Sequence, residues 1–96
     1  MNRPKFSLAA VEDLREILEY IARDKPSAAI ALVDRLEDVC NRLAANPAMG
    51  SSREDLRPHL RCFTSGSYVV YFRPADDGID VLRVLHGSRD ASAIFK

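Results

Sequence analysis

The sequence predicts an α+β fold in which a helical hairpin packs on one face of a small, mainly antiparallel sheet. Two consecutive amphipathic helical patterns occupy the N-terminal half of the chain. Three strand-like stretches with short turns occupy the C-terminal half, after a polar loop. The 96 residues suffice for one domain, which we expect to span residues 1–96.

The chain is expected to begin with a short strand at residues 3–7 (RPKFS), and Ser7 is a suitable N-cap for the helix that follows. A helix is predicted from Leu8 to about Arg23 because apolar residues recur at helical spacing, at Leu8, Val11, Leu14, Ile17, Leu18 and Ile21. The acids between them are expected to form a solvated face, namely Glu12, Asp13, Glu16 and Glu19.

A second helix is predicted from Pro26 to about Ala45. Pro26 cannot continue the first helix but suits the first turn of a new one. Its apolar stripe consists of Ala29, Val33, Leu36, Cys40 and Leu43. The dipeptide Asn46–Pro47 ends the helix. Because the break is short, the two helices should pack antiparallel as a hairpin.

The C-terminal half is predicted to form an antiparallel meander after a loop at residues 48–58. Three strands are expected, at Leu60–Thr64, Tyr68–Arg73 and Ile79–His86. The tail, Ser88 to Lys96, can add a last short helix. The hairpin covers one face of the sheet, and we expect the other face to be open to a partner.

Composition narrows the function classes. The chain has 14 basic and 14 acidic residues and no net charge, so it lacks the broad positive field of a general nucleic-acid binder. Cys40 and Cys62 have no metal-ligand spacing and are expected to be reduced, buried and unreactive. We expect no metal and no cofactor. No apolar window approaches the roughly 20 residues of a membrane span, which favours a cytoplasmic protein.

Residues 81–90 (VLRVLHGSRD) bring together the side chains best suited to catalysis or binding. His86 is a candidate general base, but without an evident partner nucleophile a hydrogen-bonded structural role is favoured. Ser88, His86 and Asp90 are the residue types of a catalytic triad. Neighbours in sequence seldom present that geometry, so a triad is not expected.

The arginines are the stronger candidates. Arg61, Arg73 and Arg83 fall on the three predicted strands, and Arg89 follows the last one. By alternation Arg83 shares a face with Ile79, Val81 and Leu85, where its charge needs an anionic partner. Either the arginines bind phosphate or a partner's carboxylates, or they form internal pairs such as Arg89–Asp90 or Arg83 with a helix acid. Both alternatives stay open. The aromatic group of Tyr68, Tyr71 and Phe72 is expected to pack within the sheet.

Four segments, taken in order, resemble the ParE toxins of the RelE/ParE superfamily of toxin–antitoxin systems. They are residues 7–29 (SLAAVEDLREILEYIARDKPSAA), 43–63 (LAANPAMGSSREDLRPHLRCF), 66–73 (GSYVVYFR) and 81–90. The resemblance implies a small cytosolic toxin neutralised by a ParD-like ribbon-helix-helix antitoxin with a flexible C-terminal segment. It also implies a hetero-oligomer with that antitoxin, contact with DNA only through it, and inhibition of DNA gyrase by binding.

The RelE branch of the superfamily instead cleaves mRNA on the ribosome. Arg61 and Arg83 resemble positions that such enzymes use, and His86 is the titratable residue that would join them. The neutral charge and Gly87, where a related nuclease branch has a tyrosine, favour a toxin that is not an enzyme. An mRNA interferase and a non-toxic antitoxin-binding module remain the alternatives.

The resemblance also suggests surfaces for the partners. We expect an amphipathic helix and an extended segment of the antitoxin to cover the hairpin groove and the open sheet face. Its acidic residues would meet the arginines Arg61, Arg73, Arg83 and Arg89. The side chains expected to contact the target are His86, Arg89 and Phe95.

Overall fold

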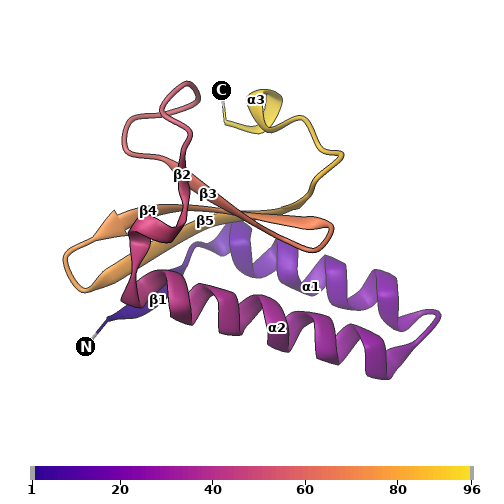
Figure 1. Ribbon diagram of the computed structural model, residues 1–96. Helices are drawn as coiled ribbons and strands as arrows, with labels where there is room; N and C mark the ends of the chain where they lie inside the picture. Colours follow the sequence, from indigo (N-terminus) through magenta and orange to yellow (C-terminus); the bar gives the residue numbers. More distant parts are fainter. Residues whose placement is uncertain (1, 96) are drawn as a thin grey trace.

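The computed structural model describes residues 2–95 and confirms the predicted α+β architecture (Figure 1). Its elements are β1 (Arg3–Phe6), α1 (Leu8–Ala22), α2 (Pro26–Ala45), the short 3₁₀ helix η1 (Pro47–Met49), β2 (Ser51–Ser52), β3 (Arg61–Ser65), β4 (Tyr68–Ala75), β5 (Gly78–His86) and α3 (Ala91–Ile94). Residues 1 and 96, the ends of the predicted domain and tail, lie outside this description. The sheet forms the middle layer, between the helical hairpin and α3 (Figure 1).

The helical hairpin has nearly the predicted bounds. Ser7 caps α1, because its side-chain oxygen accepts a hydrogen bond from the Ala10 amide at 3.0 Å. Helix α2 begins at Pro26 and ends before Asn46, as the two prolines around it predict. Part of each predicted apolar stripe packs against the sheet, as expected for amphipathic helices, namely Leu14 and Ile17 of α1 and Leu36, Cys40 and Leu43 of α2. The prediction was wrong for Leu8 and Val11 of α1, which are 81% and 53% exposed.

The sheet has five strands in the order β1-β5-β4-β3-β2. Strands β3, β4 and β5 form the predicted antiparallel meander, whereas β1 pairs in parallel with β5, from Arg3 opposite Gly78 to Phe6 opposite Val81. Strand β2 was not predicted, because it is too short to show a pattern. It lies within the expected loop and pairs with β3. This arrangement places the start of α1 beside the second half of β5.

The main hydrophobic core lies between the helical hairpin and the sheet. It is formed by buried side chains of α1, α2, β4 and β5, namely Ala10, Leu36, Val39, Cys40, Leu43, Ala44, Val70, Phe72, Ile79, Val81 and Val84. Each large side chain buried here contributes about 1.5–3 kcal/mol relative to an exposed position. Phe72 packs here as predicted, and Cys40 is also part of this core.

The second face of the sheet is not open, and that expectation was wrong. A smaller cluster covers it, consisting of Leu60, Tyr71, Leu85, Ala91 and Phe95, with Leu56, Cys62, Val69, Leu82 and Ile94 around it. The residues before β3 and the C-terminal tail supply this cover, since both lie on the side of the sheet away from the helices (Figure 1). The sequence did not predict this cover, because its apolar residues lie at the ends of two polar segments and show no helical or strand periodicity.

A β-bulge in β5 changes the facing of its second half. Tyr71 pairs with Arg83, but the next residue, Phe72, pairs with Val81, so Leu82 is the extra residue. Val81 and Val84 therefore both point to the helical side of the sheet. The prediction that Arg83 shares a face with Val81 was wrong, because simple alternation does not hold across a bulge.

Candidate functional site

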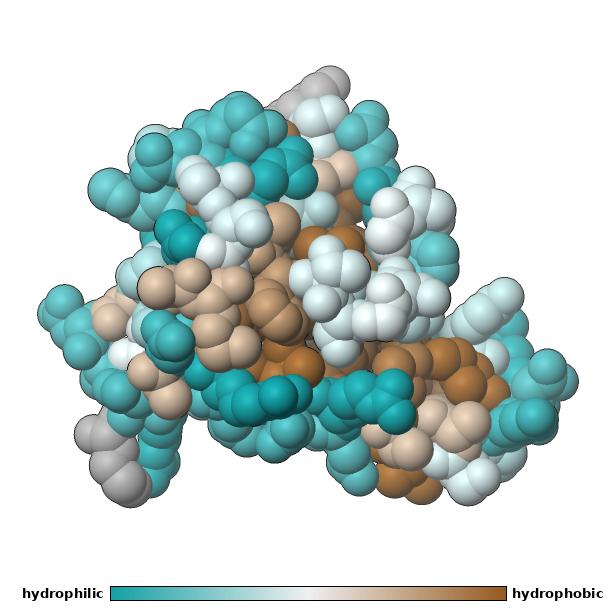
Figure 2. Space-filling model, in the orientation of Figure 1, coloured by the Kyte–Doolittle hydropathy of each residue, from teal (hydrophilic) through white to brown (hydrophobic). Residues whose placement is uncertain are grey.

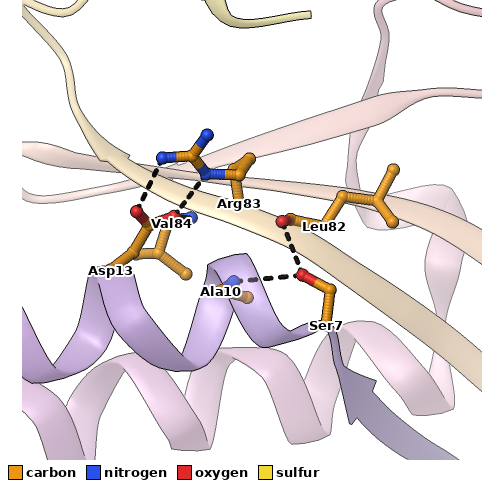
Figure 3. A network of polar contacts seen from close by, with 6 residues as sticks. All are labelled: Ser7, Ala10, Asp13, Leu82, Arg83 and Val84. Atoms are coloured by element: carbon orange, nitrogen blue, oxygen red, sulfur yellow. Dashed lines mark hydrogen bonds and ion pairs between the residues drawn. The ribbon is translucent and has the colours of Figure 1, made fainter.

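The second half of β5 has helix α1 at its edge in place of a strand (Figure 3). Strand β1 stops opposite Val81, and the Ser7 amide donates to the Val81 carbonyl at 3.0 Å. The Ser7 hydroxyl donates to the Leu82 carbonyl at 2.8 Å. These bonds satisfy the backbone of β5 where β1 has ended, so the start of α1 is held firmly against β5.

Asp13 continues this edge and is the residue that the sequence misplaced. It was expected on a solvated face, but its side chain is only 8% exposed and points toward β5 (Figure 3). One carboxylate oxygen, Oδ2, accepts a hydrogen bond from the Val84 amide at 2.9 Å. The same carboxylate binds Arg83 in bidentate fashion, at 2.7 Å to Nε and 2.8 Å to a terminal nitrogen.

This contact identifies the group that neutralises the positive charge of Arg83. The open alternative of a pair with a helix acid is confirmed, and that acid is Asp13. Hydrogen bonding to Asp13 raises the pKa of the Arg83 guanidinium above its ordinary value, while partial burial opposes the shift. Glu12 and Glu19 lie on the exposed side of α1 as predicted, where both bind Arg15.

Beyond Asp13, helix α1 and the end of β5 diverge and leave a groove of about 420 Å³. We call it the α1–β5 groove. Its walls are Asp13, Glu16, Ile17 and Tyr20 on α1, Val84, Leu85, His86, Ser88 and Arg89 at the end of β5, and Tyr68 at the start of β4. The predicted target contacts His86 and Arg89 thus meet in one groove. Tyr20 is 71% exposed there, so its ring is available to a partner.

His86 has the hydrogen-bonded structural role that the sequence favoured. Its Nδ1 accepts the Ser88 amide at 3.1 Å and lies 2.8 Å from the Ser88 hydroxyl. The ring also packs edge-on against Tyr68, with centroids 5.4 Å apart. Asp90 does not join this pair, because its carboxylate caps α3 by accepting from the Ser92 amide at 3.1 Å. No triad forms from these residues, as expected.

The three residues of the alternative nuclease set are engaged separately. Arg61 donates to the backbone carbonyls of Pro47 and Gly50, which lie before β2. Arg83 binds Asp13, and His86 binds Ser88. Of the three, only His86 lines the α1–β5 groove.

The other predicted contacts differ in their exposure. Arg73 lies on β4 opposite Asp80 and borders a separate hollow with Lys5. Arg89 is exposed in the loop after β5, and the ion pairs found among residues 2–95 do not include an Arg89–Asp90 pair. Phe95, expected to contact the target, is instead 4% exposed and packs against Tyr71. In this conformation its ring is not available to a target.

The two cysteines are both free but differ in burial. Cys40 is buried in the main core, and burial raises the pKa of its thiol to about 12, helped by the charge of Glu37. Cys62 is half-buried and also free, so it is less buried than predicted. Within residues 2–95 no group of three or more His, Cys, Asp or Glu side chains has the geometry of a metal site. Over the same range, no helix is long and apolar enough to cross a membrane.

Comparison with known proteins finds, over most of the chain, the family that the sequence motifs resemble. Residues 5–91 match the family model described as the ParE toxin of the type II toxin–antitoxin system parDE. Toxin ParE1 of Caulobacter vibrioides is 33% identical over 94 residues, which cover 97% of each chain. Toxin ParE3 of the same organism is 38% identical over 65 residues, covering 68% of this chain and 65% of its own. Toxin ParE1 of Mycobacterium tuberculosis is 39% identical over 56 residues, 57% of each chain.

Two solved structures share the fold. A chain of the chromosomal ParDE system of Pseudomonas aeruginosa superposes with a TM-score of 0.75 at 22% identity, covering 90% of this chain and 96% of its own. A chain of the toxin–antitoxin complex RelBE2 of Mycobacterium tuberculosis gives 0.60 at 22% identity, covering 88% and 96%. At this identity the two structures speak for the fold.

Proposed function

Because the chain belongs to the ParE toxin family of type II toxin–antitoxin systems, within the RelE/ParE superfamily, we propose that it is the toxin of such a pair. In this proposal it inhibits DNA gyrase by binding it and is neutralised by a ParD-like ribbon-helix-helix antitoxin. Toxin and antitoxin form a hetero-oligomer in the cytoplasm, which reaches DNA only through the antitoxin. The full-length match to a curated ParE toxin supports the family part of this proposal.

The observation that favours binding over catalysis is the way the polar side chains are used. The guanidinium of Arg83 and the imidazole of His86 already have partners within the chain, and Arg61 holds a loop. RNA cleavage needs a base, an acid and charge stabilisation in one place. The α1–β5 groove instead has Tyr20 on one wall and Arg89 on the other, and tyrosine and arginine are enriched where proteins bind one another.

The target is assigned to the α1–β5 groove. Tyr20 would enter the interface as an aromatic anchor, with His86 and Arg89 at the opposite wall. Exposed Arg89 is free to meet an acidic residue of the target and to speed association. Because Phe95 is buried, we remove it from the expected target contacts.

The antitoxin is assigned mainly to the outer side of the helical hairpin. A hollow of about 320 Å³ opens there, lined by Phe6, Val11, Leu14, Arg15, Leu18, Val33 and Glu37. Leu8, which lies at the start of α1 three positions before Val11, is 81% exposed. An amphipathic helix of the antitoxin can place its apolar face in such a groove. Of the predicted arginine contacts, Arg73 and Arg89 are exposed, whereas Arg61 and Arg83 would have to give up internal partners.

The decisive experiment adds the purified toxin to two target assays. The first follows supercoiling and DNA cleavage by gyrase, and the second follows mRNA cleavage in a translating extract. We expect gyrase-linked DNA breaks that the antitoxin suppresses, and no RNA cleavage. RNA cuts would instead support an mRNA interferase, and activity in neither assay would support a non-toxic antitoxin-binding module.

A further inference from the structure

The C-terminal tail is held on the second sheet face by one aromatic side chain. The Phe95 ring lies 5.1 Å from the ring of Tyr71, centroid to centroid, with the planes inclined by 52°. The guanidinium carbon of Arg57 lies 5.2 Å from the centre of the same ring. Leu60 and Leu85 complete the surroundings. We call these four residues, Arg57, Leu60, Tyr71 and Leu85, the aromatic socket.

From Asp90 onward, the described backbone of the tail makes no backbone hydrogen bond to the sheet. Within residues 2–95 its hydrogen bonds are local, from the Ala93 amide to Asp90 and from the Phe95 amide to Ala91. Helix α3 has only four residues and would not be stable alone. The tail therefore stays in place through side-chain packing, above all that of Phe95, and local release needs no rupture of the sheet.

A hollow lies beside the docked tail and includes Arg57, one of the four socket residues. This hollow of about 280 Å³ borders the Phe95 ring and is lined by Ser7, Ala9, Arg57, Leu82, Arg83, Ile94 and Phe95. Its lining extends from Ser7 and Ala9 at the start of α1 to Arg57 and the docked Phe95. A chain segment lying in this hollow would already contact Leu82 and Arg57 when the tail leaves.

We propose that the aromatic socket is a binding site for an aromatic side chain on an extended segment of the antitoxin, and that Phe95 occupies it in the free toxin. The tail itself shows the chemistry of the ligand: an aromatic ring that packs on Tyr71 and offers its face to the Arg57 cation. Binding of the segment exchanges one ring for another, so the apolar face never remains exposed to water. The identity of the partner rests on the proposed function, whereas the socket and its exchangeable occupant rest on the contacts above.

The test uses the tail as its own probe. A fluorescently labelled peptide of residues 90–96 (DASAIFK) is titrated against the full-length wild type and the Phe95→Ala variant, and binding is followed by fluorescence anisotropy. We expect the variant, whose socket is vacant, to bind the peptide at least tenfold more tightly than the wild type. The peptide with alanine for Phe95 should not bind, and the double variant Phe95→Ala with Arg57→Ala should lose several-fold in affinity.

Arg35→Ala serves as the matched control, because Arg35 is exposed on α2 and lies outside the socket; it should behave as the wild type does. Equal peptide affinity for wild type and Phe95→Ala, or binding of the alanine peptide, overturns the proposal. An added cognate antitoxin should displace the labelled peptide from Phe95→Ala. Failure to displace it overturns the antitoxin as occupant, whereas the gyrase assay alone decides the proposed function.

Hydrogen exchange of the wild type provides a second measurement in case Phe95→Ala does not fold. The amides of Ala93 and Phe95 should exchange at least a hundredfold faster than those of the central strands β4 and β5, because the tail opens locally. Exchange of the Phe95 amide at the rate of the central strands would show that the tail leaves only on global unfolding, and would overturn the proposal.

Discussion

At the residue scale, Asp13 connects α1 to β5 through hydrogen bonds of its carboxylate. Its carboxylate accepts three hydrogen bonds, two from Arg83 and one from the Val84 amide. It thereby gives the β5 backbone the acceptor that a neighbouring strand would have given, and it neutralises the arginine at the same time. A buried carboxylate is tolerated only with such partners.

Asp13→Ala should therefore lower the free energy of unfolding by about 2–4 kcal/mol, because it leaves a buried amide and a partly buried guanidinium without an acceptor. Chemical denaturation of the purified variant measures this loss. Glu16→Ala, one turn along α1 at an exposed position, is the matched control and should change stability by less than about 0.5 kcal/mol. A loss as small as that of Glu16→Ala would show that the Asp13–Arg83 pair is dispensable.

Cys40 gives a prediction about pH. Its thiol has an ordinary pKa of 9.0 in the unfolded chain and about 12 in the folded protein. Between these values the unfolded chain loses a proton that the folded protein keeps, so stability should fall as the pH rises above about 9. Cys40→Ala should flatten this part of the stability curve, measured by thermal unfolding between pH 8 and pH 11. A slope that is the same in both proteins would contradict the assignment.

At the scale of elements, β1 and the start of β5 approach each other closely at Gly78. Gly78 has a φ of +141°, and a Cβ at this position would lie 2.0 Å from the Arg3 carbonyl oxygen. No side chain fits there without separating the two strands. Pairing of β1 with β5 in turn places Ser7 and the whole of α1, so this glycine affects the site from a distance.

Gly78→Ala should cost about 3 kcal/mol or more of stability, from the positive φ and the clash together. The matched control is Gly66→Ala, which has a φ of +59° but open space around its Cβ. That change should cost only about 1 kcal/mol, the conformational strain alone. Comparison of the two denaturation midpoints checks the prediction, and equal losses would argue against steric contact with β1.

At the scale of the whole molecule, the sheet divides two kinds of surface. The helical side holds the main core and exposes Tyr20 and Ile30 toward the connected ends of α1 and α2. Figure 2 shows apolar residues at that end of the hairpin and in the middle of the view, with hydrophilic residues around them. The opposite side carries the smaller cluster and the tail. In the proposals above the target takes the α1–β5 groove, whereas the antitoxin takes the hollow on the helical hairpin and the aromatic socket on the opposite sheet face.

Tyr20→Ala should weaken target binding about 10- to 100-fold, the usual effect of removing an aromatic anchor, with a melting temperature close to that of the wild type. Growth inhibition and gyrase binding measure the first effect, and calorimetry the second. Arg35→Ala, on an exposed position of α2 away from the groove, is the matched control. Full toxicity of Tyr20→Ala in a stable protein would remove the α1–β5 groove from the target interface.

Local sequence patterns sufficed to predict both helices of the hairpin, β1, the three strands of the meander and the family, but not β2. The helical bounds follow from apolar periodicity and from the prolines Pro26 and Pro47, which act on the backbone next to them. The same local rules gave the three strands of the meander, and ordered motifs along the chain gave the ParE family. In the candidate site, they pointed to His86 and Arg89 but not to Tyr20, which lies off the apolar stripe of α1.

Which distant segments of the chain meet became apparent only from the folded molecule. Asp13 and Arg83 are 70 positions apart, and their pairing depends on β1 lying parallel to β5 and on the bulge at Leu82. The cover of the second sheet face depends likewise on where the tail returns. Local patterns report the neighbours of a residue along the chain. Pairing, facing and burial depend on neighbours in space, which the packing of the whole chain selects.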